Sequence, residues 1–67
     1  MKVMLRHGQQ QQLLAYVAKK DLEEEITETH TAENGMSILT LANGWKLGLR
    51  ASFENLRIPC TVEAQRL

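Results

Sequence analysis

The Asn-Gly pair at residues 43 and 44 constrains the fold of this chain more than any other feature, because it lies between two runs that alternate apolar and polar residues. Asn-Gly tolerates positive φ at both central positions of a type I′ turn, and the twist of that turn matches the twist of two paired strands. Residues 36 to 50 are therefore predicted to form a β-hairpin with a two-residue loop.

The length of the loop fixes which side chains of the hairpin share a face. A two-residue loop pairs residue 42 with residue 45, and the predicted core face then consists of Ile38, Thr40, Ala42, Trp45, Leu47 and Leu49. Lys46, Gly48 and Arg50 point the other way. Leu39 and Leu41 also fall on that second face, which is predicted to be partly covered or to be an exposed apolar patch.

Three further segments show the period-two alternation of strands. Residues 2–7 place Val3, Leu5 and His7 opposite Lys2, Met4 and Arg6, and residues 26–31 form a shorter, β-branched segment. The C-terminal run places Ile58, Cys60, Val62 and Ala64 on one side and Thr61, Glu63 and Gln65 on the other. Pro59 has no amide donor, so it is expected at the start of this strand or at a sheet edge.

The segment from residue 9 to residue 25 is ambiguous by pattern alone. Gln, Leu, Ala, Lys and Glu favour a helix, and Leu13, Leu14, Val17 and Leu22 fit a helical stripe. The same residues allow a strand over residues 13–18 that is followed by a charged turn through residues 19–25. The run of Gln at residues 9–12 is typical of a solvated loop.

Size and charge exclude several classes of function. A chain of 67 residues forms one domain, residues 1–67, whose thin core leaves little stability for an elaborate active site. Eight basic residues balance eight acidic residues, which argues against nucleic acid or an anionic membrane as a partner. One cysteine, no long apolar segment and no signal-peptide pattern predict a cytoplasmic protein, and we expect a monomer.

The residues that most often carry chemistry do not form a catalytic pattern. Cys60 falls on the predicted inward face, where a free cysteine acts as a small hydrophobic residue. His7 and His30 are too few and too far apart for a zinc site, which takes three or four protein ligands. Ser37 and Ser52 lie in no nucleophile motif. We therefore predict no catalytic residue, metal or cofactor, and no enzymatic activity.

Several short motifs together resemble one family. MKVMLR at the start, KKDLEE at residues 19–24, LANGW at 41–45 and TVEA at 61–64 resemble, in this order and spacing, the NifT/FixU family of small nitrogen-fixation proteins. The resemblance covers most of the chain. The chain departs from the family pattern at Ala18 and Glu25, where that pattern has prolines, and at residues 33–37, where it has a Trp-Gly-Gly-like segment.

The resemblance implies an all-β fold, a small barrel-like antiparallel meander of about six short strands. This favours a strand at residues 13–18. It also implies an accessory role in nitrogen fixation with no assigned activity or cofactor, and a protein partner in nitrogenase assembly or maturation.

Candidate contacts with such a partner are charged. The matched segment supplies a predicted docking edge made of Lys19, Lys20, Asp21, Glu23 and Glu24. If these residues have no binding role, they form a charged turn that is exposed to solvent.

The alternative to a protein-binding role is that the whole chain is a small β-barrel module that binds nucleic acid or a small ligand through its surface.

Overall fold

Six antiparallel strands close into a barrel in the order β1 to β6. The computed structural model describes all 67 residues. The elements are β1 (Lys2–His7), β2 (Leu13–Val17), the 3₁₀ turn η1 (Ala18–Lys20), β3 (Leu22–Thr31), β4 (Ser37–Leu41), β5 (Lys46–Leu49), the 3₁₀ turn η2 (Phe53–Asn55) and β6 (Cys60–Arg66). The predicted all-β barrel is confirmed, and the helical alternative for residues 9–25 is wrong.

Two strands close the barrel by taking part in two sheets each. The first half of β3 pairs with β2 and its second half, from Ile26, pairs with β4. Similarly, β6 pairs with β1 through residues 60–63 and with β5 through residues 64–66. A β-bulge between Ile26 and Glu28 marks the bend of β3, as expected where a strand passes from one sheet to the next.

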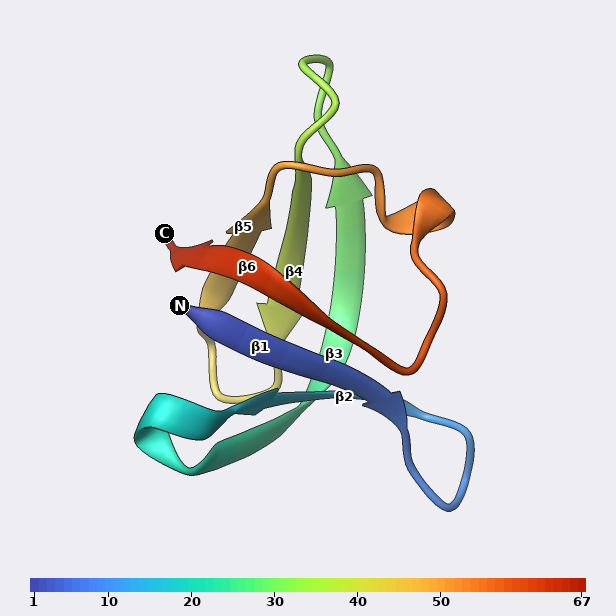
Figure 1. Cartoon of the computed structure of the whole chain (residues 1–67), viewed down its shortest axis with the longest axis vertical. Coiled ribbons are helices and arrows are strands. Elements are labelled where there is room, and N and C mark those ends of the chain that lie inside the picture. Colours follow the sequence, from blue (N-terminus) through green and yellow to red (C-terminus); the bar gives the residue numbers. More distant parts are fainter.

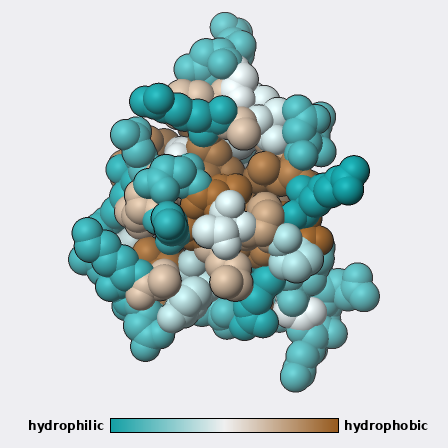
Figure 2. Space-filling view, viewed as in Figure 1, coloured by the Kyte–Doolittle hydropathy of each residue, from teal (hydrophilic) through white to brown (hydrophobic).

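The core inside this barrel is thin. Twelve of the 67 residues are buried, and the apolar ones form a single cluster of Val3, Leu5, Ala15, Val17, Ile26, Leu39, Leu41, Leu47, Leu49 and Ala64. Figure 2 shows apolar residues gathered in the middle of one face with hydrophilic residues around them. The predicted alternation is confirmed at Val3, Leu5 and Ala64, which are buried while their neighbours in sequence are exposed. It is wrong at His7, which is exposed at the end of β1.

The predicted hairpin exists, but its predicted register is wrong by one residue. Leu39 pairs with Leu47 and Thr40 pairs with Lys46. The loop holds three residues, 42–44, instead of two. The amide of Gly44 donates to the Leu41 carbonyl at 2.9 Å, and the amide of Leu41 donates to the Trp45 carbonyl at 2.8 Å. This is a type I turn followed by a left-handed residue, Gly44 at φ 94°.

The one-residue shift exchanges the two faces of β4. Leu39 and Leu41 are buried, whereas Ile38 and Thr40 are half-buried on the outside. The prediction for β5 holds, since Leu47 and Leu49 are buried. On the predicted core face, Ala42 is exposed and Trp45 is only half-buried at the end of the barrel.

A second loop repeats the same design. Gly35 has a left-handed backbone, with φ 83°. Its amide donates to the Ala32 carbonyl at 3.0 Å, and the Ala32 amide donates to the Met36 carbonyl at 2.7 Å. In each loop the Asn side chain, Asn34 or Asn43, accepts a hydrogen bond from the amide two residues later. The chain therefore uses Asn-Gly at the second and third loop positions of both hairpins.

The charged turn is shorter than predicted. It comprises η1 and Asp21, which has a left-handed backbone at φ 47°, and β3 begins at Leu22. Residues 23–25 therefore lie in a strand. The strand predicted over residues 26–31 is the second half of the same ten-residue β3.

The two ends of the chain lie side by side (Figure 1). The terminal amine of Met1 donates to the Ala64 carbonyl at 2.7 Å and to Glu63 at 3.1 Å, and the Ala64 amide donates to the Met1 carbonyl at 2.8 Å. The first residue thus extends the β1–β6 pairing.

The observed register of the hairpin can be tested by comparing neighbouring residues of β4. Leu39→Ala is expected to lower the free energy of unfolding by about 2–5 kcal/mol, because it removes a fully buried side chain. Ile38→Ala serves as the matched control and is expected to cost clearly less, because Ile38 is half-buried. Urea denaturation followed by Trp45 fluorescence measures both, and a larger loss for Ile38→Ala would contradict this register.

Candidate functional site

Two surface cavities exist, and neither lining contains a Ser, Cys or His side chain. The first, about 340 Å³, is lined by Met1, Met36, Gly48, Arg50, Glu63, Ala64 and Gln65. The second, about 450 Å³, lies at the Gln-rich loop and is lined by Arg6, Gly8, Gln9, Gln10, Gln12 and Leu14. No three His, Cys, Asp or Glu side chains cluster as metal ligands. The structure contains no helix with the length and hydropathy of a membrane span.

The most distinctive surface is the outer face of β1, β2 and β3. Met4 lies opposite Tyr16, which lies opposite Glu23, and the next row places Arg6 opposite Leu14. Side chains at these positions point away from the core, because their neighbours in sequence point into it. We call the face made by Met4, Arg6, Leu14, Tyr16, Asp21 and Glu23 the outer patch.

The apolar part of the outer patch is accessible to a partner. Met4 is 44% exposed, which makes it one of two large apolar residues of the chain that are classed as exposed. Leu14 and Tyr16 are half-buried beside it. The patch therefore combines partly exposed apolar side chains with charged groups.

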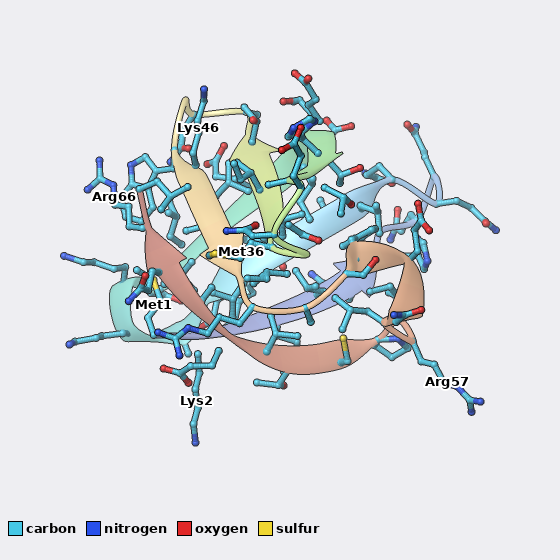
Figure 3. The ribbon with its side chains drawn as sticks, turned by 90° about the horizontal axis from the view of Figure 1, so that it is seen from above. Met1, Lys2, Met36, Lys46, Arg57 and Arg66 are labelled. Atoms are coloured by element: carbon cyan, nitrogen blue, oxygen red, sulfur yellow. The ribbon has the colours of Figure 1, made fainter.

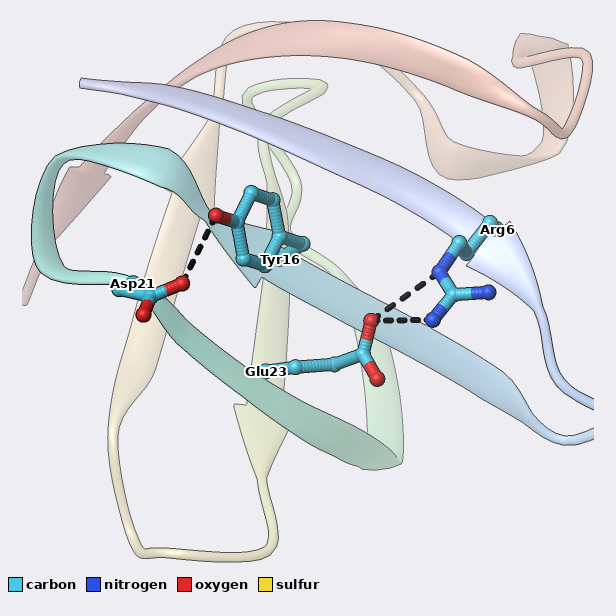
Figure 4. A network of polar contacts seen from close by, with 4 residues as sticks. All are labelled: Arg6, Tyr16, Asp21 and Glu23. Atoms are coloured by element: carbon cyan, nitrogen blue, oxygen red, sulfur yellow. Dashed lines mark hydrogen bonds and ion pairs between the residues drawn. The ribbon is translucent and has the colours of Figure 1, made fainter.

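An ion pair crosses the outer patch. Both Nε and a terminal nitrogen of Arg6 donate to one carboxylate oxygen of Glu23, the first at 3.0 Å (Figure 4). The two side chains come from strands that are separated by β2. Both are more than a third exposed, so solvent screens the pair, and its contribution to stability is about 0–1 kcal/mol.

A second polar contact orders the only tyrosine. The Tyr16 hydroxyl donates to the Asp21 carboxylate at 3.0 Å (Figure 4). This hydrogen bond, together with the negative charge of Asp21, raises the pKa of Tyr16 above its usual value, and partial burial and Glu23 add to the effect in the same direction. The hydrogen bond links the Tyr16 side chain on β2 to the turn that precedes β3.

The structure separates the five residues of the predicted docking edge. Lys19 and Lys20 are exposed in η1. Asp21 and Glu23 belong to the outer patch, where they bind Tyr16 and Arg6. Glu24 lies on the opposite side of β3 and is half-buried, because it alternates with Glu23.

Four members of the outer patch, Met4, Arg6, Leu14 and Tyr16, were not predicted as site residues from the sequence. The alternation of residues 2–7 already pointed Met4 and Arg6 outward. Their neighbours across the sheet could not be assigned, since residues 13–18 were not resolved as a strand by pattern alone.

The remaining candidates have structural surroundings. Ser37 is fully buried; its hydroxyl donates to the Ala51 carbonyl and accepts from the Phe53 amide, each at 2.7 Å. Cys60 is half-buried against the core, on the inward face that was predicted. His7 and His30 are both exposed near strand ends.

Trp45 is covered by a cation. The Arg66 guanidinium carbon lies 3.9 Å from the centre of the indole ring, a cation–π contact that contributes about 0.5–1 kcal/mol at an exposed site. In Figure 3, Arg66, Lys46 and Lys2 project from the same side of the barrel as Met1, and Arg57 projects from the opposite side.

Comparison with known proteins identifies relatives over most of the chain. The model of the family described as NifT/FixU protein matches residues 1–64. A FixU homolog from Sinorhizobium fredii is 40% identical over 55 residues, which cover 82% of this chain and 72% of that protein. FixU from Rhizobium leguminosarum bv. trifolii is 35% identical over 54 residues, which cover 81% of this chain and 77% of that protein.

One relative is much longer. Protein MosB from Rhizobium meliloti is 42% identical over 55 residues, and the match covers 82% of this chain but only 11% of MosB. The chain therefore corresponds to about a tenth of that protein.

The Tyr16–Asp21 contact predicts how the single tyrosine titrates. Because the folded protein raises the pKa of Tyr16, the stability that this contact provides is complete below the usual tyrosine pKa of about 10 and is lost as pH rises through the raised value. Asp21→Asn keeps an oxygen acceptor and suits a left-handed backbone, but it removes the charge. The Tyr16 pKa, measured by absorbance at 295 nm, is expected to fall toward about 10 in this variant. An unchanged pKa would contradict the contact.

Proposed function

The chain belongs to the NifT/FixU family, whose members are associated with nitrogen fixation, and from this premise we propose that it is a non-catalytic accessory protein that binds a protein partner in the cytoplasm. The proposed partner is nitrogenase or a factor that assembles or matures it. Family membership supports a role in nitrogen fixation. We propose the outer patch as the surface that binds the partner.

The observation that carries the proposal is the composition of the outer patch. Protein interfaces combine a desolvated centre, enriched in aromatic residues and methionine, with a polar border. Met4 and Tyr16 are adjacent across two strands, and Met4 is 44% exposed. Docking would cover the apolar area that the isolated protein leaves in contact with water.

Two of the five predicted docking residues, Lys19 and Lys20, border this surface. The η1 turn packs against β1, so the exposed Lys19 and Lys20 lie beside the strand that carries Met4. These lysines have no ion-pair partner, whereas Arg6 is paired with Glu23. Free charges at the border of an interface accelerate association with a partner of opposite sign and select against partners of like sign.

The surroundings of the aromatic residues favour a protein partner over single-stranded nucleic acid. Binding of single strands needs aromatic faces on which bases can stack, in a basic groove. One face of Trp45 is already covered by Arg66, and Tyr16 lies next to the carboxylates of Asp21 and Glu23.

Crosslinking followed by mass spectrometry in cells that are expressing nitrogenase tests the proposal. The expected result is crosslinks from Lys19 or Lys20 to a component of nitrogenase or of its maturation machinery. Crosslinks from Lys46, which lies in β5, provide the background. Repeated recovery of no such component would contradict the proposed role.

Charge reversal tests whether the predicted docking residues contribute. The double variant Lys19→Glu/Lys20→Glu is expected to weaken binding of the recovered partner about three- to tenfold, because it replaces two attractive border charges by repulsive ones. Lys46→Glu is the matched control and is expected to leave the affinity unchanged. Circular dichroism should show that all variants stay folded, since the three lysines are exposed. Equal affinities of the double variant and the control would remove Lys19 and Lys20 from the site.

A further inference from the structure

The second half of β3 has a hydrogen-bonded neighbour on one side only. Strand β2 pairs with β3 from Leu22 to Glu25, and β4 pairs with it from Ile26 to Thr31. No strand lies along the other side of this half (Figure 1). Residues 27–31 are all exposed, whether their side chains point outward or toward the barrel axis. The barrel is thus closed as a ring of strands, yet the outer backbone edge of this half of β3 stays unpaired.

The hydrogen bonds of the adjacent turn show which backbone groups this edge presents. The Ala32 amide donates to the Met36 carbonyl, so these two residues form a hydrogen-bonded pair. In an antiparallel ladder, hydrogen-bonded and non-bonded pairs alternate. Glu28 and His30 therefore direct their backbone groups to β4, and Thr29 and Thr31 direct theirs to solvent.

The side chains of the free edge are complementary to a second copy of the same strand. Residues 27–31 read Thr-Glu-Thr-His-Thr. If a second copy runs antiparallel with Thr29 opposite Thr29, then Glu28 faces His30 of the other copy and His30 faces its Glu28. A carboxylate accepts a hydrogen bond from an imidazole N–H, and Thr–Thr pairs are favourable across strands.

A two-fold axis at Thr29 is the register that both pairs Glu28 with His30 and joins backbone groups that β4 leaves free. A two-fold axis at Glu28 would place like charges opposite each other, which is unfavourable across strands. It would also place a residue whose backbone groups are already bound to β4 at the centre. An axis at Thr29 brings together two free amides and two free carbonyls, and the same patch serves both copies, as two-fold symmetry demands.

We propose that two copies of this chain pair edge to edge through residues 27–31 of β3, antiparallel and centred on Thr29. The pairing joins β5, β4 and β3 of each copy into one continuous sheet. It also covers a free strand edge, which is otherwise a site of uncontrolled association. This proposal differs from the monomer expected from the sequence, and it is independent of the proposed partner in nitrogen fixation.

Sedimentation equilibrium of the purified protein over a wide concentration range tests the pairing. The wild type is expected to dimerise with increasing concentration. His30→Glu places two carboxylates opposite each other at both symmetric positions and is expected to weaken the dimer about tenfold. The double variant Glu28→Lys/His30→Glu restores opposite charges and is expected to recover the wild-type affinity. Glu54→Lys, an exposed change in η2, is the control and should have no effect.

Disulfide crosslinking of single-cysteine variants tests which residues of the two β3 strands lie opposite each other. In a Cys60→Ser background, Thr29→Cys places two thiols opposite each other and is expected to form a covalent dimer faster than Thr31→Cys, which faces residue 27 of the other copy. Both positions are exposed on the same edge, so their reactivity otherwise matches. A protein that stays monomeric at all concentrations, a dimer that His30→Glu leaves unchanged, or equal rates for the two cysteine variants would overturn the proposal.

Discussion

The bend of β3 at its bulge is the constraint on which the rest of the structure depends. Six strands of four to ten residues can enclose a core only if some of them belong to two sheets, and β3 achieves this by turning between Ile26 and Glu28. The extra residue, Thr27, is held by a hydrogen bond from its hydroxyl to the Thr40 carbonyl at 3.2 Å. The first half of β3 can then complete the sheet that carries the outer patch, and the second half can build the β3–β4 hairpin.

The sequence predicted well those elements whose signal is local. The alternation in residues 2–7 and 58–64 gave the inward faces of β1 and β6, because one residue in two must meet the core. The hairpin of β4 and β5 was also found, but its faces were exchanged on β4. An Asn-Gly pair fits both a two-residue loop and the last two positions of a three-residue loop, and only the burial of Leu39 and Leu41 distinguishes them. The two-residue loop placed these two leucines on the face away from the core, which is unfavourable for apolar side chains and argued against that register.

The candidate site was less predictable, because it is assembled across strands. Arg6 and Glu23 are 17 residues apart and meet only because β2 lies between β1 and β3 at one fixed register. The sequence pattern of residues 13–18 could not exclude a helix, and the family resemblance decided for a strand without giving its partners. Charged residues were therefore grouped by their neighbourhood in sequence, which placed Glu24 with Glu23 although a strand directs the two side chains to opposite sides.

The adjacency of the first and last strands has a consequence for how this barrel can be used in evolution. Because the Met1 and Ala64 backbones hydrogen-bond to each other, a polypeptide that enters the barrel leaves it again at almost the same point. Such a unit can be grafted onto a host protein without separating the flanking segments of the host.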